Sequence, residues 1–159
     1  DEAELARIAD LAREIAHARD VAVVIEDHVA LAARHGLDGV HLTQGARGVR
    51  HARKELGADA IVGAFCGASR HEGMNAGEAG ADYVSFGPLG PTALGPGTPV
   101  DLELLQWWSE VIEVPVVAEG ALDAALIRAV WPVADFIALG PEIWQAPDPA
   151  EALSALWPV

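Results

Sequence analysis

Two patterns of apolar and polar positions alternate along the chain. Residues 2–18 repeat apolar side chains at helical spacing, with Leu5, Ile8 and Leu11 on one face and charged groups on the other. A short and almost entirely apolar run, VAVVI at 21–25, comes next. Such a run predicts a strand that is buried on both faces, as strands in parallel sheets are.

This pairing of a helical segment with a short apolar run repeats to the end of the chain. The other predicted strands are GVHL (39–42), AIVGAF (60–65), DYVSFG (82–87), VPVVAE (114–119) and DFIALG (135–140). Repeated units of this kind predict an α/β protein with a parallel sheet, which is either doubly wound and open or a β/α barrel. A barrel closes with eight strands, so it would need about two strands before those counted here.

Three aspartates mark the starts of helices. Asp101, Asp123 and Asp148 each precede an apolar-periodic segment, where a carboxylate can accept hydrogen bonds from free backbone N–H groups. The helix after Asp101 is predicted to direct Trp108 and Val111 inward. Before it lies a Gly- and Pro-rich connection of about thirteen residues, a length that is uncommon in compact domains unless the loop is functional.

Composition narrows the classes of partner. The chain has 159 residues with a formal net charge of −14, which argues against nucleic acid and anionic membranes. It contains no run of about 18 uncharged apolar residues, so no membrane span is expected. The N-terminal segment does not resemble a signal peptide. One cysteine, Cys66, excludes an internal disulfide and fits a reducing cytoplasm.

Four stretches follow one another along the chain: VVIEDHVALAARHGLDGVHLTQ, AIVGAFCGAS, AGADYVSFGPLGPT and VPVVAEGA. In this order and spacing they resemble the thiamine phosphate synthase family and its relative, the TenI-type thiazole tautomerase. The resemblance covers about residues 21–143. It implies a TIM-type (β/α)8 barrel with about six βα units present, so that 1–159 would form a single, N-terminally incomplete barrel domain.

The resemblance also implies a reaction. Members of the family join hydroxymethylpyrimidine diphosphate to thiazole phosphate and release pyrophosphate, with magnesium and basic donors on the leaving group. A small phosphorylated thiazole or pyrimidine ligand, magnesium, a cytoplasmic location and a homodimer are therefore expected. Membrane and nucleic-acid partners are not.

The first group of implied site residues lies after the first two predicted strands. Asp27 matches a magnesium-binding aspartate of the family, although it could instead cap the following helix. Glu26 stands where the family has an asparagine that contacts the diphosphate, and His28 replaces the next position. Gln44 matches a family glutamine, whereas the second magnesium aspartate falls on Ala46.

The second group lies in the loop after the strand at 82–87. Gly87 and Thr92 match the family, and the resemblance implies that Thr92 takes part in catalysis. A second threonine and a lysine of the family fall on Leu94 and Gly95. Cys66 lies at or next to a position where the family has a catalytic hydroxyl, although a buried structural thiol is the alternative.

The third group lies in the turns after the last two strands, where the resemblance implies that backbone amides bind the thiazole phosphate. These turns contain Gly120, Ala121 and Gly140. Glu119 and Glu142 add negative charge, which predicts a weakened phosphate site.

Two further hypotheses stay open. Because Ala46 and Gly95 replace charged groups, the chain could be a catalytically depleted ligand-binding or regulatory homologue. An unrelated aldolase-like barrel is disfavoured, because the single lysine, Lys54, lies on a predicted helix and not at a strand end. The tryptophans form either a subunit interface or part of the core.

Overall fold

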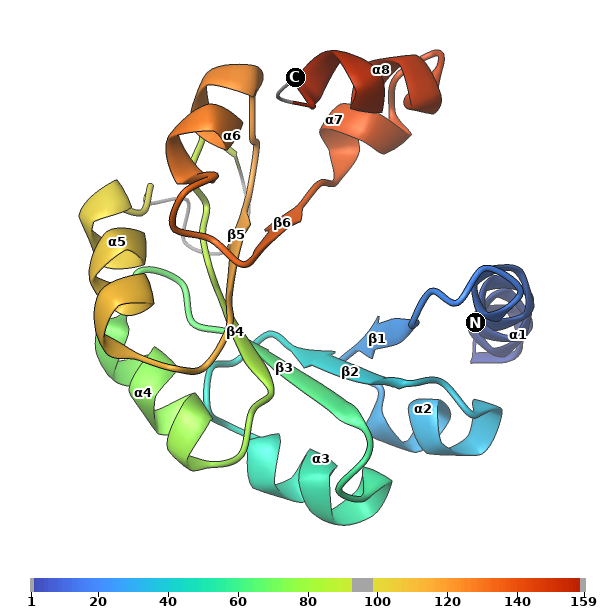
Figure 1. The fold of residues 1–159 in the computed structure, drawn as a ribbon. Coiled ribbons are helices and arrows are strands. Elements are labelled where there is room, and N and C mark those ends of the chain that lie inside the picture. Colours follow the sequence, from blue (N-terminus) through green and yellow to red (C-terminus); the bar gives the residue numbers. More distant parts are fainter. Residues whose placement is uncertain (1, 93–98, 158–159) are drawn as a thin grey trace.

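The computed structural model describes residues 2–92 and 99–157. Six parallel strands form one sheet in the order β1-β2-β3-β4-β5-β6 (Figure 1). The strands are β1 (Val24–Glu26), β2 (Gly39–Leu42), β3 (Ile61–Phe65), β4 (Tyr83–Phe86), β5 (Val116–Glu119) and β6 (Phe136–Ala138). Because all neighbours are parallel, the carboxyl ends of the six strands lie along one edge of the sheet.

Helices cover one face of this sheet. They are α1 (Glu2–His17), α2 (Val29–His35), α3 (Val49–Leu56), α4 (Arg70–Glu78), α5 (Leu102–Val111), α6 (Ala124–Val130), α7 (Pro141–Trp144) and α8 (Pro149–Leu156). Figure 1 shows α2 to α6 on the outside of a curled sheet, whose other face is concave. The predicted TIM-type architecture is confirmed, and the doubly wound alternative is wrong because it requires helices on both faces.

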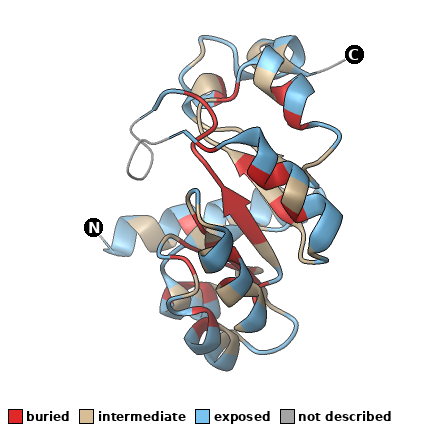
Figure 2. Cartoon of the chain, turned by 90° about the vertical axis from the view of Figure 1, so that its left-hand side faces the viewer, coloured by how far each residue is buried: buried red, intermediate tan, exposed pale blue. Residues whose placement is uncertain are grey.

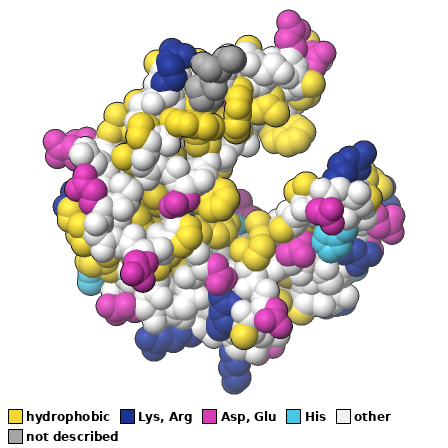
Figure 3. Space-filling model, viewed as in Figure 1, with side chains coloured by type: hydrophobic (Ala, Val, Ile, Leu, Met, Phe, Trp, Pro, Cys, Tyr) yellow, Lys and Arg dark blue, Asp and Glu magenta, His cyan; other side chains and the backbone are white. Residues whose placement is uncertain are grey.

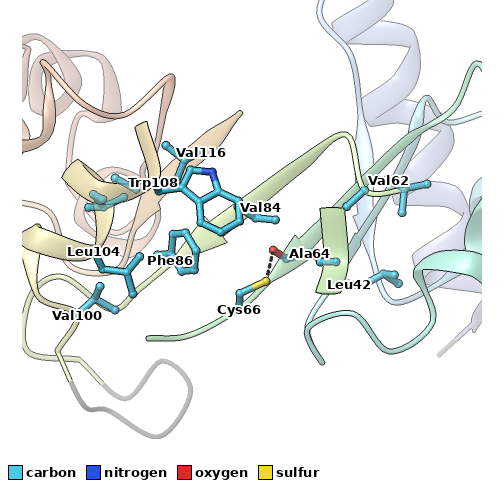
Figure 4. Close-up of a cluster of buried hydrophobic side chains, with 14 of the residues drawn as sticks. Leu42, Val62, Ala64, Cys66, Val84, Phe86, Val100, Leu104, Trp108 and Val116 are labelled. Carbon is cyan, nitrogen blue, oxygen red and sulfur yellow. Dashed lines mark hydrogen bonds between the residues drawn. The ribbon is translucent and has the colours of Figure 1, made fainter. Parts of the chain in front are cut away.

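The core lies between the convex face and the helices. Val40, Val62 and Val84 lie on the neighbouring strands β2, β3 and β4, and all three are fully buried. Figure 2 shows buried residues on the central strands and exposed residues on much of the surrounding helices. Beside them Phe86 and Trp108 meet edge to face, with ring centroids 5.0 Å apart (Figure 4). Burial of such aromatic side chains is the largest single contribution to a core of this size.

Aspartates fix the local geometry at both helix and strand starts. The carboxylates of Asp101, Asp123 and Asp148 accept hydrogen bonds from backbone N–H groups in the first turns of α5, α6 and α8, as predicted. Immediately before β4, Asp82 accepts a hydrogen bond from the N–H of Val62, on the neighbouring strand β3.

The same arrangement occurs at two other pairs of strands. Asp38, before β2, accepts from the N–H of Val23, and Asp135, before β6, accepts from the N–H of Val116. Three pairs of strands are therefore joined at their amino ends by an aspartate.

Three predicted details differ. Strand β1 begins at Val24, not at position 21. Val111 is 57% exposed because α5 ends there and the chain becomes extended. On α1, Ile8 and Leu11 are about half exposed, at 48% and 50%, although they form the predicted apolar face. Periodicity identifies such a face but does not determine what covers it.

The tryptophans differ in burial, and a subunit interface stays a prediction for the exposed ones. Trp108 belongs to the core, and its indole N–H donates to the carbonyl of Val114 at 2.8 Å. Trp131, Trp144 and Trp157 are exposed. In the described part of the chain, no helix has the length and apolarity needed to cross a membrane.

Candidate functional site

A cavity of about 450 Å³ occupies the concave face of the sheet and is lined by residues from all six strands. Its walls are mostly apolar (Figure 3). Strand alternation places the lining residues on this face, because their neighbours along each strand point into the core. The polar side chains in its lining are those of His41, Tyr83, Ser85 and Glu119.

The side chains of Tyr83 and His41 are hydrogen-bonded to each other across a glycine that lies between them in the sheet. Gly63 pairs with both residues in register, and a Cβ at Gly63 would lie 2.0 Å from the Tyr83 ring. The ring therefore lies across β3, and its hydroxyl is 2.9 Å from Nδ1 of His41. Burial, with a contribution from the negative charge of Glu119, raises the pKa of Tyr83 to about 12. This hydrogen-bonded pair forms one wall of the cavity.

The side chains of Ser85 and Glu119 each have a buried polar atom that lacks a hydrogen bond within the described part of the chain. Among the described residues, the hydroxyl of Ser85 and Oε1 of Glu119 have no hydrogen-bond partner, and both atoms are nearly inaccessible to water. Gly87 makes room for the glutamate, since a Cβ there would lie 2.8 Å from Cγ of Glu119. Sequence reasoning missed Ser85, although a small polar residue within the apolar run DYVSFG is a usable signal.

A second cavity of about 270 Å³ lies at the carboxyl edge, between the turns that follow β5 and β6. It brings together four residues that the sequence predicted for the site: Thr92, Gly120, Ala121 and Gly140. Glu119 lines this cavity as well as the concave one.

The loop after β4 supports the turn after β5. The N–H of Gly90 donates to the carbonyl of Gly120 at 2.9 Å. A Cβ at Gly90 would lie only 2.2 Å from the carbonyl oxygen of Ala121, so the two segments pack backbone to backbone. Gly120 and Ala121 have φ values of +92° and +52°, which form a tight left-handed turn. The predicted threonine and lysine positions, Leu94 and Gly95, lie outside the described residues.

One amide predicted to bind phosphate already has a partner. The N–H of Gly140 donates to Oε1 of Glu142 at 2.9 Å, so a carboxylate lies where an anion was expected. A phosphate that uses this amide has to displace Glu142. This geometry agrees with the expectation of a weakened phosphate site.

Asp27 is held by internal hydrogen bonds. Its Oδ1 accepts from the N–H of Thr43 at 2.9 Å, and its Oδ2 accepts from the Thr43 hydroxyl. The helix-cap alternative is wrong, because His28 is the N-cap residue of α2 and makes no side-chain cap. Asp27 and His28 line a separate cavity beside α2.

The described residues do not fit a magnesium site built by the protein. They contain no group of three or more His, Cys, Asp or Glu side chains that could hold a metal ion. Asp27, the one predicted ligand, offers two oxygens that already accept hydrogen bonds.

Two other predicted residues, Gln44 and Cys66, line a further cavity of about 490 Å³, whereas Glu26 lies apart from it. Gln44 accepts a hydrogen bond from Arg47 at 3.3 Å. Cys66 is buried with Sγ 3.5 Å from the carbonyl of Ala64, and burial, with the charges of two glutamates, raises the pKa of its thiol to about 12. This environment favours a packing role over a nucleophilic one. Glu26 is exposed on edge strand β1, opposite His41.

The curled parallel sheet and the cavities at its carboxyl edge define a β/α-barrel protein with a small-ligand site. The family model described as "Thiamine monophosphate synthase" matches residues 1–143. The chain belongs to the thiamine phosphate synthase family.

Individual relatives agree with this assignment. The thiamine-phosphate synthase of Rhodospirillum centenum is 47% identical over 97% of this chain and 75% of its own length. That of Erythrobacter litoralis is 44% identical over 94% of this chain and 72% of its own. The solved thiamine phosphate pyrophosphorylase from Pyrococcus furiosus superposes with a TM-score of 0.87 at 27% identity, covering 98% of this chain and 75% of that one.

Proposed function

We propose that the chain acts in thiamine biosynthesis as a thiamine phosphate synthase. In this reaction the C–O bond between the pyrimidine methylene and the diphosphate breaks, and its electron pair leaves with pyrophosphate. The ring nitrogen of thiazole phosphate then donates its lone pair to the methylene carbon. The relatives at 47% and 44% identity support this function over a regulatory homologue without turnover.

The observation that carries the proposal is the meeting of Thr92, Gly120, Ala121 and Gly140 around one cavity at the carboxyl edge. Backbone N–H groups in such turns bind phosphate in barrels of this kind. We place the phosphate of thiazole phosphate here, and Glu142 leaves the amide of Gly140 when the phosphate enters.

The concave cavity supplies space for the two rings. Its volume of about 450 Å³ and its apolar lining suit flat heteroaromatic groups. Gly87, at the carboxyl end of β4, lies beside Glu119 at the border of this space and holds its backbone close to the ligand. The rings then lie against Tyr83 and Val117, while the phosphate groups lie toward the open edge.

Magnesium, a homodimer and a cytoplasmic location remain predictions from the family. Asp27 would be the carboxylate that contacts magnesium, and each of its oxygens, which accepts one hydrogen bond from Thr43, has a further lone pair for the ion. We assign no step to the metal, because the described side chains do not build its site.

Calorimetric titration with thiazole phosphate tests the proposal, together with chromatographic detection of thiamine phosphate after both substrates are supplied. Glu142→Ala frees the amide of Gly140 and is expected to bind thiazole phosphate about 3- to 10-fold more tightly. Glu151→Ala is the matched control at the start of α8 and should bind like the wild type. Failure of both the wild type and Glu142→Ala to bind thiazole phosphate or thiamine phosphate would refute the function.

A further inference from the structure

Glu119 holds a particular position between the two cavities. It is the last residue of β5 and lines both the concave cavity and the cavity at the carboxyl edge. Thr92 and Gly140 contribute only to the edge cavity, whereas Tyr83 and Ser85 contribute only to the concave one. A ligand that spans both spaces therefore passes the Glu119 carboxylate.

The carboxylate has acceptor capacity that the protein does not use. Oε1 of Glu119 is buried without a hydrogen-bond partner in the described structure, and no ion pair joins Glu119 to a basic side chain there. An unpaired carboxylate in a partly buried position is unfavourable unless a positive group approaches it. The hydroxyl of Ser85, which is 1% exposed, is also unpartnered and lines the same concave cavity.

Other polar groups of the two cavities are engaged within the protein. Glu142 accepts from the amide of Gly140, and Tyr83 pairs with His41. Of the carboxylates that line either cavity in the described structure, Glu119 is the one with a buried oxygen that has no hydrogen-bond partner. An anionic ligand group gives this oxygen no favourable partner, whereas a ligand N–H or a cationic ring does, and the cationic ring gains more from the negative charge of the carboxylate.

We infer that Glu119 stabilises the positive charge that forms during the reaction, an inference that rests on the proposed function. When the methylene–oxygen bond breaks, its electrons leave with pyrophosphate and the pyrimidine methylene becomes cationic. When the thiazole nitrogen bonds to that carbon, the charge moves to the thiazolium ring. Both steps occur where the rings in the concave cavity meet the phosphates at the edge, beside Glu119.

This assignment explains an acidic residue next to a phosphate site. The negative charge of Glu119 disfavours the binding of the anionic substrates. As pyrophosphate departs, however, the group beside Glu119 becomes the cationic pyrimidine methylene and then the thiazolium ring. A preorganised carboxylate contributes most where charge develops in a site with little water. The hydroxyl of Ser85 orients the same ligand from the adjacent strand.

The binding test compares thiamine phosphate, whose thiazolium is cationic, with its neutral thiophene isostere. The wild type should prefer the cation about 10- to 100-fold, and Glu119→Gln should reduce that preference to about threefold or less. Glu110→Gln, on the outer surface of α5, should keep it. Melting curves of all variants confirm that they fold, and Glu119→Asp, which keeps the charge, should retain most of the preference.

The kinetic test separates transition-state stabilisation from substrate binding. Glu119→Gln should lower kcat about 10- to 100-fold and change KM for thiazole phosphate by less than about threefold. A folded Glu119→Gln that keeps both the cation preference and kcat overturns the inference while leaving the proposed function intact. A wild type that binds neither thiazole phosphate nor thiamine phosphate overturns the function itself.

Discussion

The polar groups at and near the carboxyl edge of the sheet differ between its two halves: several in one half have partners within the protein, and two in the other half have none among the described residues. After β1 to β3, Asp27 is bonded to Thr43, Gln44 accepts from Arg47 and the Cys66 thiol is buried. On β4 and β5, Ser85 and Glu119 carry polar atoms without partners in the described structure. Family motifs mark residues in both halves. In the first half these residues divide between two cavities, one lined by Asp27 and His28 and one by Gln44 and Cys66, whereas in the second half a single cavity brings four of them together.

The difference separates stabilising from ligand-binding roles. A buried polar group that is internally bonded contributes to stability, whereas an unpaired one destabilises the free protein and is satisfied by a ligand. The amide of Gly140 is the exception in the second half, because Glu142 occupies it. We therefore expect changes in the first half to affect mainly stability and changes in the second half to affect mainly ligand binding.

The largest expected effect concerns Cys66 in the first half. Burial raises the pKa of its thiol from 9.0 to about 12, so the folded protein keeps the proton at pH values where the unfolded chain loses it. At about pH 8, alkylation by iodoacetamide should be about 10³-fold slower in the native protein than in urea. Mass spectrometry measures both rates. If the native protein is alkylated at a rate within about tenfold of the unfolded rate, Cys66 is reactive and the hypothesis of a catalytic thiol stands.

The next effect concerns Gly90 in the second half. Gly90→Ala places a Cβ against the carbonyl of Ala121, 2.2 Å away, and neither backbone segment can yield easily. We expect a loss of about 1–3 kcal/mol in the free energy of unfolding and about tenfold weaker binding of thiazole phosphate. Urea unfolding and calorimetry measure the two effects. Gly57→Ala is a contrasting control: a Cβ there meets nothing within 4 Å, so any loss of stability comes from its φ of +91° alone, and thiazole phosphate binding should stay unchanged.

The strands, the helices and the helix caps could be predicted from the sequence, because these features depend on residues that are close together along the chain. The strand carrying Ser85 and the cap at Asp123 follow from local pattern alone. The meeting of Ser85 with Glu119 does not, because it depends on the register of β4 with β5 and on the space left by Gly87. No spacing rule along the chain encodes that register.

Motif matching assigned Asp27 as a magnesium ligand, and this role stays a prediction. The partner that engages its carboxylate, Thr43, is 16 residues away and lies just beyond the next strand. The family pattern gives the position of the acid, whereas the hydrogen bonds depend on how β1 and β2 align. The exposed face of α1 is a similar case, since Ile8 fits the apolar pattern without being covered.

A smaller effect should follow from Asp27→Ala. Loss of the two hydrogen bonds from Thr43 is expected to lower the free energy of unfolding by about 1 kcal/mol. Thr43→Ala removes one of the bonds and should cost less, and the double variant should show coupling between the two sites. Thiazole phosphate binding should stay unchanged. If Asp27→Asn is stable but needs far more magnesium for turnover, Asp27 is a metal ligand instead.

The smallest effect concerns Asp38, which joins β1 to β2 as Asp135 joins β5 to β6. Burial alone would raise the pKa of Asp38 above its ordinary value of 3.8, but hydrogen bonds from the N–H of Val23 and from His17 outweigh burial and lower it. A lowered pKa stabilises the fold above pH 3.8, and this contribution disappears as pH falls through the folded-state value. Wild type should therefore exceed Asp38→Asn in urea-unfolding stability at neutral pH and converge with it in acid. Asp59→Asn, an exposed control, should show no such convergence, and an Asp38→Asn difference that persists at low pH would mean that geometry rather than charge holds the two strands together.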